Sequence, residues 1–199
     1  MTLERKAGKQ AEKSRMTREK LVNASVEVIK EKGFSAASAK DIAIRAGITW
    51  GAAQHHFGTK EEILMEILKR SHDRFIERLS SPDLASGSLA ERAARFVNLM
   101  WEHYQEDLYL ATIEIVSGTR GVGFQSAIKP FADEHLEHLR EIFPESEISA
   151  SRLQEALLFA HFCLTGMATE RLLDRKEMRV EAHLDRCRKV VTSIVCGTE

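Results

Sequence analysis

The chain has 199 residues, 30% of them charged, and a formal net charge of −1. This length can bury a sizeable core and allows one or two domains. No run approaches the ~18 apolar residues of a membrane span, and the N-terminus lacks the apolar segment of a secretory signal. The three cysteines (Cys163, Cys187 and Cys196) point to reduced thiols in a cytoplasmic protein, not to a disulfide framework.

The charge is distributed unevenly along the chain. Residues 1–60 carry 12 Lys and Arg against 6 Asp and Glu, whereas the remaining residues have a net charge of −7. A basic end on an acidic body is expected where one end of a protein meets phosphates. Residues 1–16 are expected to form a basic, flexible arm. In homeodomains such an arm reaches into an adjacent minor groove of DNA. The alternative for residues 1–16 is a solvated tail without a DNA contact.

The first predicted helix follows this arm. Leu21, Ala24 and Val28 recur at helical spacing, Thr17 is a plausible cap at the beginning, and Gly33 ends the pattern. The sequence therefore predicts a helix from about residue 17 to residue 32.

Residues 38–46 predict a second, short helix. Ser38 and Asp41 have the three-residue spacing of a capping box, which satisfies backbone donors where a helix begins. Ile42 and Ala43 contribute an apolar face. Gly47 follows the last apolar position, where a left-handed backbone is least costly without a Cβ atom.

A third helix is predicted directly after this glycine. Thr49 is placed to cap it, and Ala53 and Phe57, four residues apart, share its buried face. Two short helices joined by a glycine turn have the layout of a helix-turn-helix. The alternative is three amphipathic helices without a role in DNA binding. The residues left on the other faces of the third helix are Trp50, Ala52, Gln54 and His55.

From Thr17 to about Leu68 the sequence resembles the tetracycline-repressor-like (TetR/AcrR) regulators of bacteria. The resemblance rests on the segments 17–21, 31–34, 41–43, 45–49 and 55–64. It implies an all-α fold with an N-terminal three-helix helix-turn-helix domain (residues 17–62) and a helical effector-binding and dimerisation domain (residues 63–199). It also implies a ligand-responsive regulator, expected to be a repressor. This regulator binds a palindromic operator as a homodimer and is released by a small, mostly apolar effector.

The resemblance also indicates which residues contact DNA. Thr49, His56 and Lys60 are expected to hold phosphates, and Trp50, Ala52 and His55 to lie nearest the base edges. Trp50 stands where the family commonly has a basic or small residue, and Gln54 where it usually has tyrosine, so the operator sequence is not readable. The full expected set is Ser38, Lys40, Thr49, Trp50, Gly51, Ala52, Gln54, His55, His56 and Lys60.

The rest of the chain is expected to be helical, because no alternating strand pattern occurs and there are only three prolines. Helices are predicted at about 60–79, 88–105, 106–118 and 124–143, with a break or bend at Pro130. Two longer helices follow, at about 149–174 and 177–196. The connections include a loop at 120–123 and a turn at 144–146.

The last two predicted helices are candidates for a dimer interface. Residues 153–173 are apolar almost all round, so this helix must be covered on more than one side. The last helix has an apolar stripe at three- and four-residue spacing. The family's dimer is a four-helix bundle of these two helices from each subunit, and the alternative is that the stripe closes a monomeric core. The stripe consists of Val180, Leu184, Cys187, Val191 and Ile194.

Large side chains in the body suggest an effector pocket, since apolar walls with a few polar groups suit a small lipophilic ligand. Bulky residues at helical spacing are otherwise ordinary core residues. The candidates expected to face inward are Phe96, Met100, Trp101, Tyr104, Glu114, Phe131, His135, Phe159 and Met167.

Other chemistry has less support in the sequence. His135 and His138 with Glu134 have a spacing that places ligands on one helix face, but a solvated face is the more common reading, and no metal or cofactor is expected. No nucleophile motif occurs, so no catalytic residue is assigned. A redox switch through Cys187 or Cys196 remains an alternative, although buried inert thiols are more common.

The second class of function that the sequence allows is an enzyme or carrier whose basic N-terminal end is incidental. A regulator of this kind is expected in the bacterial cytoplasm, at the nucleoid when bound to DNA.

Overall fold

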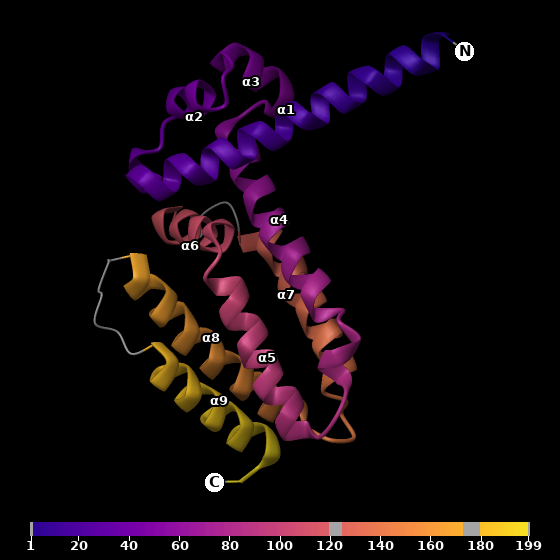
Figure 1. Ribbon diagram of the computed structural model, residues 1–199, viewed down its shortest axis with the longest axis vertical. Helices are drawn as coiled ribbons and strands as arrows, with labels where there is room; N and C mark the ends of the chain where they lie inside the picture. The colour runs from indigo at the N-terminus through magenta and orange to yellow at the C-terminus, as the bar shows by residue number, and fades with distance from the viewer. Residues whose placement is uncertain (1, 120–124, 173–179, 199) are drawn as a thin grey trace. The chain divides into compact units, whose positions relative to one another are not determined.

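The computed structural model describes residues 2–119, 125–172 and 180–198, and every regular element in these ranges is helical (Figure 1). The all-α fold class is therefore confirmed. The helices are α1 (Thr2–Lys32), α2 (Ala39–Arg45), α3 (Trp50–Phe57), α4 (Lys60–Leu79), α5 (Leu89–Tyr104), α6 (Asp107–Thr119), α7 (Gln125–Ile142), α8 (Ala150–Leu172) and α9 (Val180–Cys196), with 3-10 turns η1 (Phe34–Ala36) and η2 (Pro82–Ala85).

Helix α1 begins well before the predicted position. We expected a cap at Thr17, but the Thr17 hydroxyl donates to the Lys13 carbonyl, 2.9 Å away, in the interior of the helix. The preceding residues are mostly good helix formers. Arg15 also pairs with Glu12 and Glu19, each at 2.7 Å, at the three- and four-residue spacings that support a helix. The segment expected to be an arm is therefore helical.

The end of α1 agrees with the sequence. Gly33 has a φ of 76°, a left-handed conformation that residues with a Cβ rarely adopt, and η1 follows at once.

The chain divides into two compact units, and the first comprises residues 1–71 and 107–125. Its core is made by apolar side chains of α1 to α4, among them Leu21, Ile42, Phe57 and Ile63, which are at most 2% exposed. Helix α6 packs against α1 in this unit, and Lys30 and Asp107 form an ion pair of 2.7 Å between them. The helix-turn-helix region therefore packs with a helix that lies more than forty residues further along the chain.

The second unit comprises residues 72–106 and 126–199, and here α9 packs against both α5 and α8. Phe96, Leu164 and Val191, one from each of these helices, are at most 2% exposed. The buried Arg92 donates to the Ile142 carbonyl at 2.7 Å, and its charge is paired with Glu147, an exposed residue at the edge of the core. The boundary predicted between residues 62 and 63 and the one between the units, at 71 and 72, both fall within α4.

The predicted helices of the body are confirmed within the described residues, with ends that differ by a few positions. Ser88 caps α5 in a complete capping box with Glu91. Pro130 lies inside the continuous helix α7 and does not end it. The loop predicted at 120–123, the start of the helix predicted at 124 and the segment 173–179 lie outside the described residues.

Within the described ranges, no helix combines the length and apolar character needed to cross a membrane.

Candidate DNA-binding site

The first element of the candidate site is α2, which begins as predicted. Ser38 accepts a hydrogen bond from the Asp41 backbone amide at 3.1 Å, and its hydroxyl donates to the Asp41 carboxylate at 2.6 Å. Lys32 of α1 contacts the same carboxylate at 2.9 Å. Hydrogen bonds from Ser38 and Lys32 lower the pKa of Asp41 to about 2. Gly47 has a φ of 72°, which confirms the left-handed turn before α3.

Helix α3 also has the predicted cap and the predicted buried face. The Thr49 hydroxyl accepts from the Ala52 amide at 3.2 Å. Ala53 and Phe57 are 0% and 2% exposed, so these two side chains fix which side of α3 faces the core. Trp50 is half-buried, and the other side chains on the outer face are open to solvent. The exposed residues are Gly51, Ala52, Gln54 and His55.

Arg18 of α1 holds the far end of α3. Its guanidinium lies over the Phe57 ring, 4.2 Å from the centroid, and donates to the His56 carbonyl at 3.1 Å. It also pairs with Glu66 of α4 at 3.6 Å. The Ser14 hydroxyl lies 3.3 Å from Nδ1 of His56, one of the expected phosphate ligands. Sequence reasoning missed Arg18. Its partners are about 40 residues away, and the only signal was its place in the segment 17–21.

Lys60, another expected phosphate ligand, has contacts inside its own unit. Its ammonium donates to the Ala37 carbonyl and lies 5.1 Å from the centroid of the Phe34 ring. The Phe34 amide in turn donates to the Glu114 carboxylate of α6, at 2.8 Å. Glu114 was expected to face an effector, but in the structure it anchors η1. The side chain of Lys60 is therefore half-buried and held in place before any DNA binds.

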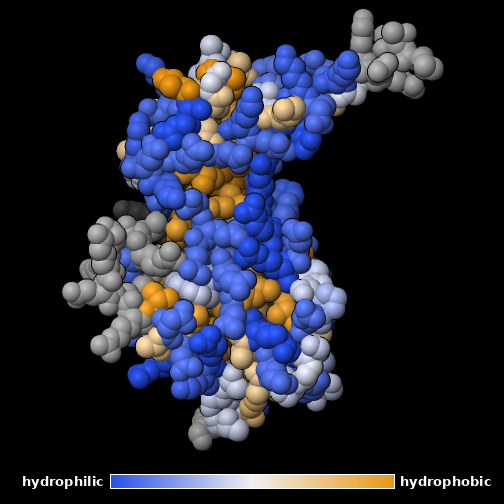
Figure 2. Space-filling model, in the orientation of Figure 1, coloured by the Kyte–Doolittle hydropathy of each residue, from blue (hydrophilic) through white to orange (hydrophobic). Residues whose placement is uncertain are grey.

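The outer surface of this unit suits an anionic partner. Helix α3 contains no acidic residue, and the acid of α2, Asp41, is neutralised by Lys32. Lys40 of α2 is exposed. In Figure 2 the region of α1 to α3 is mostly hydrophilic on the face in view. A polar surface with positive charge and no free acid on α3 is what contact with a phosphate backbone requires.

Most of the expected effector residues lie in the second unit. Phe96, Met100, Trp101, Tyr104 and Met167 are buried, with 2–7% exposure, and Phe131 and His135 are half-buried.

Phe159 does not face inward as we expected, because it is 38% exposed. The buried positions of α8 (residues 153, 156, 160, 164, 167 and 168) recur at helical spacing, and Phe159 falls off this face.

His135 belongs to a cluster of rings between α4 and α7. His72 Nδ1 lies 3.0 Å from His135 Nε2, and His72 Nε2 lies 2.7 Å from the Glu134 carboxylate. Phe131 stacks on His72, with 4.3 Å between centroids. Burial, with smaller contributions from His72 and His103, lowers the pKa of His135 to about 4, so this ring is neutral near pH 7.

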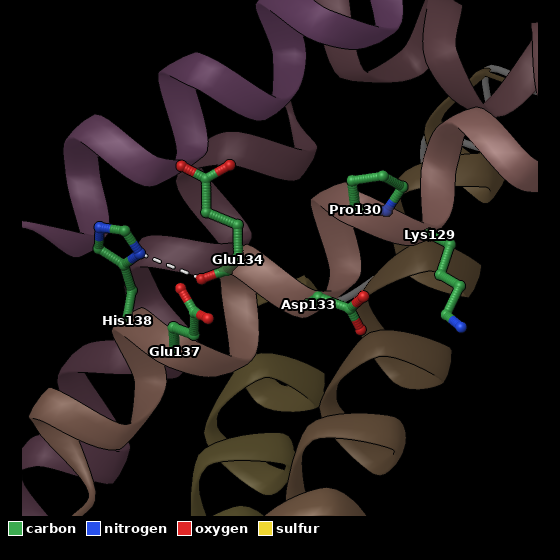
Figure 3. A pocket seen from close by; sticks show the side chains of 6 residues that line it. All are labelled: Lys129, Pro130, Asp133, Glu134, Glu137 and His138. Carbon is green, nitrogen blue, oxygen red and sulfur yellow. Dashed lines mark hydrogen bonds between the residues drawn. The ribbon is translucent and has the colours of Figure 1, made fainter.

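The surface of α7 has an open hollow of about 470 Å³ that is lined by charged residues, a histidine and a proline, and none of the expected effector residues lines it (Figure 3). His138 donates to the Glu134 carbonyl within the same helix, whereas His135 contacts His72. The two histidines therefore do not converge. Among the described residues, no three His, Cys, Asp or Glu side chains are grouped to hold a metal ion. The residues of the hollow are Lys129, Pro130, Asp133, Glu134, Glu137 and His138.

Comparison with known proteins identifies the same region. Residues 21–67 match the model of the bacterial regulatory proteins of the tetR family. The chain is 36% identical over 69 residues to the HTH-type transcriptional regulator CymR of Pseudomonas putida. This aligned region covers 35% of this chain and 34% of CymR. It is 29% identical over 93 residues to the fatty acid metabolism regulator protein of Bacillus subtilis, covering 47% and 48%. The matches span a third to a half of these relatives.

Solved structures resemble the chain over most of its length. A TetR transcription regulator from Haloarcula marismortui superposes with a TM-score of 0.72 and 16% identity, covering 92% of this chain and 98% of the other. FadR from Bacillus subtilis, solved in complex with stearoyl-CoA, gives a TM-score of 0.67 and 21% identity, covering 90% and 98%. At these identities the likeness shows the fold: an N-terminal helix-turn-helix followed by a helical domain. Residues 21–67 thus match the tetR family of bacterial regulatory proteins, and the relatives that align over this part of the chain include the HTH-type transcriptional regulator CymR.

Proposed function

We propose that the chain is a transcriptional regulator that binds a specific DNA sequence through α3. The observation that supports this proposal most directly is the outer face of α3, where Gln54 and His55 are exposed beside the half-buried Trp50. The helix that presents these residues is fixed at both ends. Thr49 caps the beginning of this helix, and Arg18 holds its end. A helix presented in this way can enter the major groove, where hydrogen bonds to base edges distinguish sequences. The expected DNA contacts named above, from Ser38 to Lys60, belong to this proposal.

The test is selection of genomic fragments of the source organism by the full-length chain at moderate salt. We expect retained fragments to share a palindromic sequence, and the double variant Trp50→Ala/His55→Ala to lose about tenfold or more in affinity for them. The matched control is Leu136→Ala/His183→Ala, which changes exposed residues of α7 and α9. Equal competition by random DNA contradicts the proposal and favours the enzyme or carrier alternative.

The proposal includes a homodimer, because a palindromic site needs two DNA-binding units at a fixed spacing. Its support is the outer face of α8, where Leu158, Phe159 and Phe162 are 45%, 38% and 67% exposed. The stripe on α9 does not serve this purpose. Leu184, Cys187 and Val191 are at most 4% exposed and close the core of the chain's own second unit.

The proposal also includes release from DNA by a small, mostly apolar effector bound in the second unit. The apolar core of α5 and α8 supports it, with His72 and His135 nearby as polar groups. The FadR structure was solved with stearoyl-CoA, so stearoyl-CoA is the first probe. We expect it to displace a retained duplex from the chain at concentrations at which coenzyme A alone has no effect.

A further inference from the structure

The first two thirds of α1 carry a row of unpaired lysines, which we call the lysine stripe: Lys9, Lys13 and Lys20. They are exposed, and their spacings of four and seven residues place them within about 40° on one face of the helix. Among the described residues none of the three has an ion-pair partner. The nearby acids, Glu12 and Glu19, are both engaged by Arg15. The stripe is therefore a local concentration of uncompensated positive charge.

Further along α1, the face that carries the stripe meets the end of α2. The same face continues to Glu27 and Glu31, seven and eleven residues after Lys20. Both glutamates pair with Arg45 at the end of α2, at 3.1 and 2.6 Å. Figure 1 shows α1 running on past α2 and α3 toward its N-terminus. The face thus changes from acidic, where α2 covers it, to basic, where the helix extends beyond the motif.

The helical state of this segment decides which part of DNA it fits. An α-helix with side chains is about 10–12 Å across, whereas the minor groove of B-DNA is about 6 Å wide. A helical segment therefore does not enter the minor groove as an extended arm would. Lysines are suited to the phosphates at its edge, where compact ammonium groups act as point charges.

The dimensions of the stripe also agree with a backbone contact. Four residues of helix rise by about 6 Å and eleven by about 16 Å. Phosphates along one strand follow at about 3.4 Å of axial rise, so the stripe spans about five phosphate steps. We propose that the lysine stripe binds backbone phosphates flanking the sequence read by α3. This inference rests on the proposed function, because it assigns a second DNA contact to the same unit.

The test compares salt dependence on two duplexes made from a fragment retained by the wild-type chain. One is trimmed to the protected palindrome, and the other keeps flanks of about one helical turn, roughly 10 base pairs, on each side. The variant is Lys9→Gln/Lys13→Gln, because glutamine has a helix propensity similar to that of lysine. On the long duplex we expect the slope of log Kobs against log salt to fall in magnitude by about 1.8 per chain bound, about 0.9 for each lost phosphate contact. On the trimmed duplex we expect no change.

Two controls separate the stripe from total charge. Lys129→Gln/Lys189→Gln removes the same charge from exposed lysines of α7 and α9 and is expected to leave both slopes unchanged. Lys9→Arg/Lys13→Arg keeps the charge and is expected to keep the wild-type slope. A stripe variant with the wild-type slope on the long duplex overturns the inference while the proposed function stands. If the wild-type chain retains no fragment selectively, the proposed function itself fails.

Discussion

At the scale of single residues, Lys60 combines an internal contact with an expected external one. Its ammonium donates to the Ala37 carbonyl and lies over the Phe34 ring. An ammonium has three donor hydrogens, so one hydrogen bond to a carbonyl leaves donors for a phosphate. The internal contact also holds the side chain in one place, which lowers the entropy lost when DNA binds.

Lys60→Gln separates the two contacts, because the glutamine amide still donates to a carbonyl but carries no charge. We expect weaker binding to all sequences and a salt slope reduced by about 0.9, one phosphate contact. Lys60→Ala removes the contact with Ala37 as well, and we expect it to lower the free energy of unfolding by about 1 kcal/mol in addition. Fluorescence anisotropy across a salt series and urea denaturation measure the two effects. If the slope of Lys60→Gln equals that of the wild type, Lys60 has no phosphate contact.

Residue-level predictions succeeded where the signal was local. The caps at Ser38 and Thr49, the left-handed Gly47 and the end of the first helix at Gly33 follow from spacings of a few residues, and the structure confirms all four. Partners distant in sequence were not predictable in this way. Glu114 lies 80 residues from the Phe34 amide that it accepts from, and a single carboxylate on a predicted helix contains no information about that partner.

At the scale of elements, α6 supports the region that carries Lys60. Glu114 accepts from the Phe34 amide, and the Phe34 ring packs against α6 at Gly118. A Cβ atom built on Gly118 lies 2.3 Å from Cδ1 of Phe34, far closer than two carbons approach. The glycine is therefore required by the close approach of the ring, although glycine in a helix is otherwise unfavourable.

Gly118→Ala tests this support, because helix propensity and packing predict opposite changes in the free energy of unfolding. Propensity alone predicts stabilisation by about 1 kcal/mol. The displaced Phe34 ring predicts destabilisation by about 1–3 kcal/mol, as in an overpacked core, and weaker DNA binding, since Lys60 lies over that ring. Urea denaturation shows whether the free energy of unfolding rises or falls. The control is Gly8→Ala in α1, where the added Cβ meets nothing within 4 Å and a small stabilisation is expected. A stabilised Gly118→Ala chain with unchanged DNA affinity excludes the role we assign to the Phe34 ring.

Element types were predictable because nearly every helix has an apolar period and a recognisable cap or glycine at one end. The predicted start of α1 was wrong, because Thr17 has the character of a helix cap and the polar residues before it show no apolar periodicity. Their helical state rests on propensity and on the pairs of Arg15, which are weaker signals than burial. Phe159 was placed wrongly because α8 is apolar all round, so its sequence does not show which face is buried.

At the scale of the whole molecule, the outer face of α8 is expected to be covered in solution. Leu158 and Phe162 stand four residues apart, and Gly166 follows four residues later, where an added Cβ meets nothing within 4 Å. A row of two large residues and a glycine on one helix face can accept a second helix at close range. Each large side chain buried in such a contact contributes about 1.5–3 kcal/mol.

Phe162→Glu places a charge in the centre of this face without touching the chain's own core, because Phe162 is 67% exposed. We expect the wild-type chain to sediment as a dimer and the variant as a monomer with unchanged helix content, since a buried, unpaired carboxylate is costly. The matched control is Leu136→Glu on α7, another exposed large apolar residue, at 46%, for which the dimer is expected to persist. A palindrome is occupied by two chains of a dimer at once. The monomeric variant should therefore also lose most of its affinity for a retained duplex while keeping its salt-dependent binding to random DNA. Sedimentation of Phe162→Glu as a dimer, or of Leu136→Glu as a monomer, places the interface elsewhere than on α8.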